Sequence, residues 1–205
     1  MIQDIWPQKL KNEYIEKEVS AESLVVIFRN REVLIRRNEE EELFLPTYRE
    51  LSEQGRLQGM AERLQYLFSV GSREYFLYPS WEREAEEITG YHYENVRILR
   101  QMISKEVCFG VMTAFHLFVW YRDNRFCGRC ASSLQHDHVE RMLRCPSCGN
   151  MVYPKIAPAV IVALTDGDKI LMTRYADREY KKYALLAGFT EIGETAEETV
   201  EREVM

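Results

Sequence analysis

The sequence predicts an α+β fold, and three features support that class. Short apolar, β-branched stretches separated by polar breaks dominate the first 80 residues. A long helical periodicity follows, and four closely paired cysteines come directly after it. Strand-like stretches and a capped helix occupy the remainder. We expect a β-rich N-terminal domain ending in an amphipathic helix at residues 1–122, a four-cysteine zinc ribbon at residues 123–153, and a partial hydrolase domain at residues 154–205.

Two hairpins are predicted in the N-terminal domain, because apolar runs flank short polar breaks. Their strands are expected at Ser23–Phe28 and Glu32–Ile35, around Arg29–Arg31, and at Leu64–Val70 and Glu74–Tyr78, around Gly71–Ser72. Residues 48–60 are polar with weak helical character, and residues 81–88 are interpreted as a short helix or turn.

An amphipathic helix is predicted over Lys105–Asp123. Its apolar side chains recur at i, i+4, i+8 and i+11, in the order Val107, Val111, Phe115 and Phe118. Cys108 lies in this apolar run, so we interpret it as a buried, inert thiol. No linker rich in Gly or Pro separates the helix from the first cysteine pair, so we expect the helix to hold the ribbon against the N-terminal domain.

Bulk composition argues against several classes of protein. The net charge of -6 and the pI of about 5.4 do not favour sequence-independent binding along nucleic acid, which needs a basic surface. No stretch approaches the roughly 20 apolar residues of a membrane span. The first ten residues have neither the basic nor the apolar region of a secretion signal, so we expect the protein in the cytoplasm.

Four of the five cysteines predict one structural zinc ion per chain. Cys127 and Cys130 form one C-x2-C turn, and Cys145 and Cys148 form a second one fourteen residues later. Two such turns supply the four ligands of a tetrahedral Zn²⁺ site, which leaves no open position for catalysis. A redox motif is the alternative, but it needs a C-x2-C pair at the start of a helix in a βαβ unit.

Two histidines between the cysteine pairs are candidate ligands as well. We interpret His136 and His138 as exposed loop residues, because four sulfurs already complete the zinc shell. The same loop has no aromatic residue and as many acids as arginines, which is a poor surface for nucleic acid. We therefore expect the ribbon to act as a scaffold.

The C-terminal part predicts three strands and a helix. The strands are expected at Ala159–Leu164, Lys169–Arg174 and Tyr183–Ala187, with a turn at Asp166–Asp168 and a glycine-containing loop at Gly188–Glu194. Thr195 and Glu198 have the spacing of a capping box, so the helix begins after Thr195. Val200 and Val204 give it an apolar face.

The stretch from Gly188 to Met205 resembles the Nudix box, a pattern of diphosphate-cleaving hydrolases. Matching positions are Gly188, Glu194, Arg202, Glu203 and Val204. The glutamate pair, glycine and aliphatic residue that follow in the pattern would lie after residue 205, so we expect this chain to be inactive by itself. For Glu203 taken alone, a solvated helix glutamate is the alternative.

The chemistry of diphosphate cleavage explains the pattern. Divalent cations neutralise the phosphate oxygens and activate water, and Mg²⁺ and Mn²⁺ prefer carboxylate ligands. The resemblance implies that Glu203 is the first metal-binding glutamate of the helix and that Arg202 supports it by a salt bridge. The Ala187 carbonyl is a candidate for a further metal ligand, since glycine after it allows close approach.

The order of modules is similar to that of the NADH pyrophosphatase (NAD⁺ diphosphatase) family of Nudix hydrolases, with a truncated α/β/α sandwich at the end. The resemblance is close from Phe126 to Met205 and loose before Arg97. It implies hydrolysis of NADH or NAD⁺ to nicotinamide mononucleotide and AMP, removal of NAD caps from RNA 5′ ends, a catalytic Mg²⁺ or Mn²⁺, and a homodimer.

Four residues match substrate-contacting positions of that family: Tyr153, Phe189, Glu140 and Arg97. Residue chemistry leaves other interpretations open, namely core or interface aromatics for Tyr153 and Phe189 and a surface acid for Glu140. Two alternative functions also stay open at this point. One is a zinc-ribbon nucleic-acid binding protein with a degenerate hydrolase tail, and the other is a non-catalytic dimerisation protein.

Overall fold

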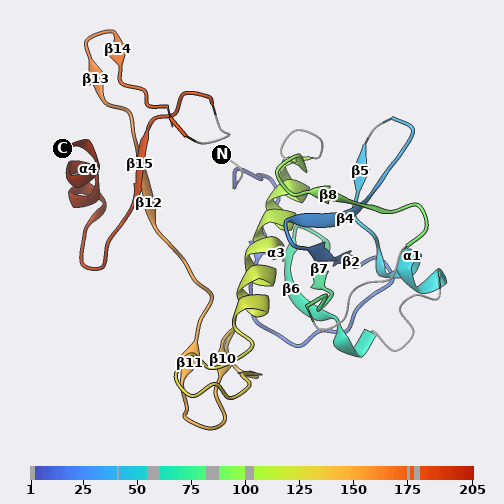
Figure 1. Ribbon diagram of the computed structural model, residues 1–205. Coiled ribbons are helices and arrows are strands. Elements are labelled where there is room, and N and C mark those ends of the chain that lie inside the picture. The colour runs from blue at the N-terminus through green and yellow to red at the C-terminus, as the bar shows by residue number, and fades with distance from the viewer. Residues whose placement is uncertain are drawn as a thin grey trace. The chain divides into compact units, whose positions relative to one another are not determined.

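A computed structural model gives the fold of the chain. It describes residues 3–40, 42–54, 61–81, 88–99, 104–174, 176–177 and 181–205. These residues form two compact units, Met1–Pro154 and Lys155–Met205, each of which is described by itself (Figure 1). The mixture of short strands and helices confirms the α+β class.

The first sheet of the N-terminal unit has four strands in the order β1-β6-β7-β2. Its strands are β1 (Leu10–Lys11), β6 (Gln65–Val70), β7 (Arg73–Leu77) and β2 (Leu24–Val26). Strands β6 and β7 form the predicted hairpin, and Gly71 takes a φ of 61° in its turn. Strand β2 pairs with β7 in parallel, a long-range pairing that local sequence patterns do not show.

The second sheet contains the other predicted hairpin. Its strands are β3 (Phe28–Arg29), β4 (Glu32–Arg37), β5 (Leu43–Phe44) and β8 (His92–Asn95). Strand β4 pairs antiparallel with each of the other three. The tight β3–β4 turn passes through Asn30, which has a φ of 55°. Asparagine tolerates this left-handed conformation better than most residues with a side chain.

The apolar run in β2 and β3 is buried on both faces. Val26 and Phe28 belong to a core that includes helix α3 (Lys105–Asp123), whereas Val25 and Ile27 belong to a second core around Leu51. Successive side chains of a strand point to opposite faces, so a strand between two cores must be apolar throughout. This explains why the sequence there shows no alternation of apolar and polar residues.

Helix α3 spans Lys105–Asp123, as predicted, and packs on the first sheet (Figure 1). Gly110 faces the ring of Tyr75, and a Cβ at this position would overlap that ring. Val111 and Phe118 are buried, and so is Cys108, which confirms its predicted burial. Val107 and Phe115 are only half-buried and pack at the edge of the core.

The weakly helical stretch near residue 48 contains a short helix, α1 (Tyr48–Glu53), and a 3-10 turn follows at Ala61–Arg63. Thr47 and Glu50 form a capping box that the sequence interpretation did not recognise. The rest of that prediction, residues 55–60, lies outside the described residues, and so does most of the helix or turn predicted at residues 81–88.

The cysteine ribbon belongs to the N-terminal unit and packs on it. It consists of β9 (Gln135–His136), β10 (Leu143–Arg144) and β11 (Met151–Val152) in one antiparallel sheet. Leu143 is part of the core around α3. The guanidinium of Arg141 donates to the Leu67 carbonyl, and the Tyr14 hydroxyl donates to the Asp137 carbonyl at 2.7 Å. The ribbon is therefore fixed to the domain, as expected.

The described part of the C-terminal unit contains two pairs of strands and a helix. They are β12 (Ala159–Val162), β13 (Thr165–Asp166), β14 (Lys169–Ile170), β15 (Leu186–Phe189) and α4 (Ala196–Val204). The turn at Gly167 is confirmed, but the return strand is short and β12 pairs with β15 instead. Gly188 and Phe189 were expected in a loop; that was wrong, because pairing with β12 extends the strand through them.

Within the described residues, no helix has the length and apolar character needed to cross a lipid bilayer.

Candidate zinc centre and carboxylate–arginine cluster

The four predicted zinc ligands come together within the ribbon. The Sγ atoms of Cys127, Cys130, Cys145 and Cys148 all lie within 4.8 Å of one another. Individual separations are 3.6 Å for Cys127–Cys148, 3.4 Å for Cys130–Cys145 and 3.5 Å for Cys130–Cys148. Zinc–sulfur bonds of about 2.3 Å in a tetrahedron require sulfurs about 3.8 Å apart. The cluster therefore fits one zinc ion.

Hydrogen bonds favour the thiolate, the form that binds zinc, at Cys127 and Cys130. At Cys148 the backbone hydrogen bond of Asn150 acts in the same direction, but burial and contacts with the other three sulfurs outweigh it and raise the pKa to about 12. The Arg129 N–H donates to Cys127 Sγ at 3.4 Å and lowers the pKa of that thiol. The Ser132 side chain contacts Cys130 Sγ at 3.5 Å and is the main cause that lowers the pKa of Cys130 to about 6. Such hydrogen bonds hold the ligands in place and stabilise their negative charge.

The two candidate histidines lie outside the sulfur cluster. His136, in β9, stacks on the ring of Tyr121 with a centroid separation of 5.0 Å. His138 is strongly exposed and faces Glu16 at 3.4 Å. Both are thus surface residues of the ribbon, as the sequence suggested, although His136 is in a strand and not in a loop.

A carboxylate–arginine cluster forms where β15 and α4 meet in the C-terminal unit. Arg202 binds Glu194 with two hydrogen bonds, from Nε to Oε1 at 2.6 Å and from Nη2 to Oε2 at 2.9 Å. Nη2 also donates to the Phe189 carbonyl at 2.8 Å, and Nη1 is paired with Glu203. One guanidinium therefore joins the end of the strand, the loop and the helix, in the planar geometry that arginine provides.

Glu194 is the anchor of this cluster. Its carboxylate accepts hydrogen bonds from Arg202, from the Glu191 N–H at 3.0 Å and from the Thr199 hydroxyl at 3.1 Å. These interactions, that with Arg202 foremost, lower the pKa of Glu194 to about 2. Glu194 consequently stays negatively charged and holds Arg202 in one orientation.

Glu203 reaches back from α4 over β15. Its carboxyl group lies directly against Gly188, where a Cβ would overlap it. Gly188 pairs with Val160 in the strand, so the backbone there is fixed while the missing side chain leaves room for the carboxylate. Ala187 immediately precedes Gly188 in β15, so its carbonyl belongs to the same fixed stretch of backbone.

The helix start is also fixed by hydrogen bonds. Thr195 caps α4 by accepting from the Glu198 N–H, while the Glu198 carboxylate accepts from the Thr195 N–H, which confirms the predicted capping box. Thr199 is fully buried in the first turn and donates to Glu194 and to the Thr195 carbonyl. The loop and the first helical turn are thus locked to each other.

The predicted substrate residues belong to both units of the chain. In the N-terminal unit, the Tyr153 hydroxyl donates to Glu140 Oε2 at 2.9 Å, and this contact raises the pKa of Tyr153. Phe189 is on β15 in the C-terminal unit and is 67% exposed. Arg97 is exposed in the turn after β8, where its backbone N–H donates to Asn95. The hydrogen bond between Tyr153 and Glu140 joins two of the four.

Sequence reasoning placed Glu194 in the motif without giving it a role, and it overlooked Thr199. The signal for Glu194 is its spacing of eight residues from Arg202, which brings a loop carboxylate to the second turn of the helix. No comparable signal exists for Thr199. A threonine one turn into a polar helix is common, and only the three-dimensional loop shows that its hydroxyl is enclosed.

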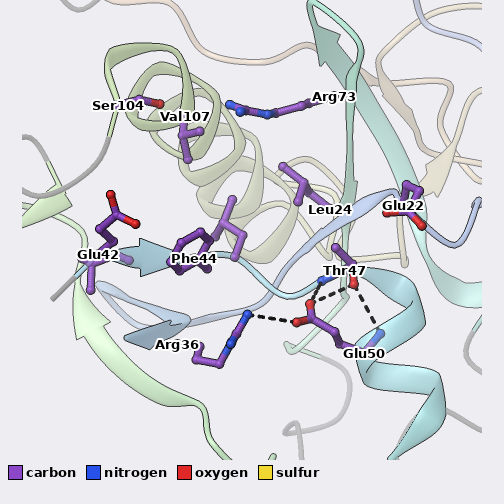
Figure 2. Close-up of a pocket in the computed structure, with 12 residues that line it drawn as sticks. Glu22, Leu24, Arg36, Glu42, Phe44, Thr47, Glu50, Arg73, Ser104 and Val107 are labelled. Carbon is purple, nitrogen blue, oxygen red and sulfur yellow. Dashed lines mark hydrogen bonds and ion pairs between the residues drawn. The ribbon is translucent and has the colours of Figure 1, made fainter. Parts of the chain in front are cut away.

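A pocket of about 780 Å³ lies elsewhere, in the N-terminal unit, with Arg36 and Arg73 in its lining (Figure 2). It contains none of the predicted site residues. Its acidic groups are engaged in local contacts: Glu50 accepts from Arg36 at 3.2 Å and from the Thr47 hydroxyl at 2.8 Å, and Glu22 is paired with an arginine of α1. We therefore assign it no role in the chemistry of the cluster.

Comparison with known families matches two consecutive parts of the chain. Residues 122–153 match the NADH pyrophosphatase zinc ribbon domain, and residues 155–205 match the NUDIX domain. The first range contains all four clustered cysteines. The second contains Glu194, Arg202 and Glu203.

Curated relatives agree with this pair of domains. The NAD-capped RNA hydrolase NudC of Pseudomonas aeruginosa (strain LESB58) is 43% identical over 91 residues, which are 44% of this chain and 33% of that protein. The protein of the same name from Erwinia tasmaniensis is 33% identical over 150 residues, 72% of this chain and 56% of that protein. The chain thus spans between a third and somewhat more than half of these relatives.

Proposed function

Because the chain belongs to the NADH pyrophosphatase family of Nudix hydrolases, we propose that the protein carrying it hydrolyses the central diphosphate of NADH or NAD⁺. The products would be nicotinamide mononucleotide and AMP. NAD-capped RNA presents the same diphosphate, and the matched relatives are named for hydrolysing it, so we include removal of this cap in the proposal. The observation that carries the proposal is the cluster of Glu203, Arg202 and Glu194 beside Gly188.

In this reaction Glu203 would hold a divalent cation, Mg²⁺ or Mn²⁺, with the Ala187 carbonyl as a second candidate ligand. Both are oxygen donors, which these cations prefer, and both lie in or next to the stretch of strand that Gly188 keeps open. The cation supplies charge neutralisation for the diphosphate oxygens and activation of water. Only part of a metal shell is present in Glu203 and Ala187, so the proposal requires further ligands.

Arg202 would act as a positioning residue. It contacts Glu203 on one side and is held by Glu194 on the other, so the carboxylate of Glu203 is kept in place by charge-assisted hydrogen bonds. Because the pKa of Glu194 is about 2, this support is fully present at neutral pH. An ordered carboxylate loses less freedom when it binds a metal ion, which favours a defined metal geometry.

Tyr153, Glu140, Phe189 and Arg97 are proposed to contact the dinucleotide. The exposed ring of Phe189 offers a surface for stacking on a base, and the hydrogen-bonded Tyr153–Glu140 pair offers polar contacts for a ribose or an amide. Arg97 offers a cation for a phosphate. The zinc ion has a structural part in this scheme, because four sulfurs leave it no position for substrate. A homodimer and a cytoplasmic location remain predictions from the sequence.

The test is hydrolysis of NADH by the natural protein that carries this chain, with chromatographic detection of AMP. We expect turnover that depends on added Mg²⁺ or Mn²⁺ and that falls at least about a hundredfold in Glu203→Gln, which keeps the size of the side chain but removes its charge. Glu201→Gln is the matched control, because Glu201 is an exposed glutamate of the same helix. Equal loss in both variants, or full activity in Glu203→Gln, would contradict the assignment.

A further inference from the structure

A basic pocket lies in the N-terminal unit, between the β3–β4 turn and helix α3. Its volume is about 440 Å³, and it is lined by Asn30, Arg31, Phe115, His116, Val119 and Arg122. Among the residues that the structure describes, two arginines and a histidine contribute to the lining, and no acidic residue does. This is unusual in a chain whose net charge is -6. A concave, positively charged site of this kind favours a small anion over a cation.

The cations of this pocket are available to a ligand. Arg31 is exposed and forms no salt bridge within the described part of the chain. Arg122 is paired with its neighbour Asp123 at 2.7 Å, with side-chain exposures of 36% and 53%. Exposed pairs of this kind contribute little free energy, so the Arg122 guanidinium can turn to an incoming anion at small cost.

The backbone fixes where Arg31 lies. Asn30 takes a left-handed φ of 55° in the β3–β4 turn, and the Val96 N–H donates to the Arg31 carbonyl at 3.0 Å. The segment after β8 is thereby tied to the same turn, and it carries Arg97 as the next residue. Arg97 is exposed but is not one of the residues that line the pocket.

Phe115 gives the pocket a fixed aromatic wall. It is half-buried, and its ring packs on Phe28 and Phe118 with centroid separations of 5.3 Å and 6.2 Å. Val119 lies one turn further along α3 and adds apolar surface. A rigid aromatic surface beside arginines is the combination with which proteins bind nucleotides, since bases stack on rings while guanidinium groups hold phosphates.

We propose that this pocket binds the phosphate group of a nucleotide between Arg31 and Arg122, with the base against Phe115. Its volume lies within the range of about 300–1,000 Å³ that small-molecule sites occupy. A free mononucleotide and a single nucleotide within an RNA strand present the same chemistry here. The inference rests on the pocket alone and does not depend on the proposed hydrolysis.

The test is direct binding to the full chain with zinc bound. Cytidine 5′-monophosphate is the probe for titration calorimetry, because it is neither substrate nor product of the proposed hydrolysis, and cytidine without phosphate is the matched ligand. The second probe is a five-nucleotide RNA without an NAD cap, whose binding is measured by fluorescence anisotropy. We expect saturable binding of the monophosphate and little binding of cytidine.

Variants locate the binding. Arg31→Ala and Arg122→Ala should each raise the Kd of the monophosphate about tenfold, since each removes charge-assisted hydrogen bonds to phosphate. Arg49→Ala, which removes an exposed arginine of α1, is the control and should leave the Kd unchanged. Phe115→Leu keeps an apolar side chain but removes the ring. It should therefore weaken binding of the monophosphate and leave binding of inorganic phosphate unchanged.

The RNA probe distinguishes the two sources of the nucleotide. Binding of RNA that weakens in Arg31→Ala would support a nucleotide of an RNA strand, whereas binding of the monophosphate alone would support a free mononucleotide. Absence of saturable binding by both probes would overturn the proposal. An unchanged Kd in Arg31→Ala and Arg122→Ala, with melting temperatures equal to that of the parent chain, would overturn it as well.

Discussion

The two units of the chain are each stabilised internally by a different kind of interaction. The N-terminal unit has two clusters of buried apolar side chains and a four-sulfur ribbon fixed to one of them. In the described part of the C-terminal unit, Thr199 is the single buried residue, and large apolar side chains such as Ile161 and Ile192 are exposed. Hydrogen bonds around Arg202 and the cap of α4 hold that unit instead. The comparison shows that a carboxylate cluster can be held by polar contacts where the described residues of a unit form no apolar core.

Loss of zinc should have the largest effect on the stability of the N-terminal unit. Cys145→Ser should reduce the bound zinc from one ion per chain to nearly none and unfold the ribbon, since structural zinc contributes roughly 10 kcal/mol of binding free energy. Zinc content by elemental analysis and the melting temperature would measure this. Cys108→Ala is the matched control, because Cys108 is buried in the core away from the cluster and should leave the zinc content unchanged.

The second largest effect should be a difference in amide hydrogen exchange rate between the two units. Amides of β6 and β7, between the two cores, should exchange at least about a thousandfold more slowly than those of β12 and β15, because they open only with the whole domain. Mass spectrometry of peptides from each strand would show it. Equal protection in all four strands would mean that the C-terminal unit is stabilised by something other than the polar contacts described above.

A single methyl group should disturb the carboxylate cluster. In Gly188→Ala the new Cβ would overlap the carboxyl group of Glu203 and displace it, and misplacement by about 1 Å can cost a hundredfold in rate. We expect NADH hydrolysis by the natural protein to fall by about that factor while the zinc content stays constant. Gly128→Ala, where a Cβ meets open space, serves as the control for the change in residue type.

The smallest predicted effect concerns pH. The pKa of Glu194 is lowered to about 2 from its ordinary value of 4.5, so its contribution to stability is fully present above about pH 4.5 and is lost as the pH falls through 2. A carboxyl titration by NMR should find this low pKa, and Arg202→Ala should raise it towards the ordinary value. A titration near pH 4.5 in the parent chain would show that the contact between Glu194 and Arg202 is weak in solution.

Much of the fold was predictable where the signal is local. The α3 helix, the turns at Gly71 and Gly167, and the cap at Thr195 each follow from a few neighbouring residues, and all four are observed. Pairing between distant strands was not predictable, because periodicity says which face of a strand is buried but not which strand lies next to it. The parallel pairing of β2 with β7 and the extension of β15 through Phe189 are of this kind.

The candidate sites show the same division. Cysteine spacing predicted which four sulfurs lie together, since each C-x2-C turn fixes its own pair of sulfurs. The resemblance to the motif from Gly188 to Val204 predicted the contact between Arg202 and Glu203. The anchoring role of Glu194 depends on how the loop folds back on the helix. The pocket around Arg31 had no sequence signal, because its residues come from a turn and a helix more than 80 positions apart.

Two kinds of metal are proposed: a structural zinc ion and a separate cation bound by Glu203. Removing them selectively is the most direct test of this distinction. The natural protein that carries this chain would be treated with a mild chelator, and its zinc content and NADH hydrolysis would be measured on the same sample. We expect that hydrolysis stops while one zinc ion per chain remains, and that Mg²⁺ or Mn²⁺ restores it. Activity that disappears in proportion to the loss of zinc, and that returns with zinc alone, would mean that the zinc ion itself serves the reaction.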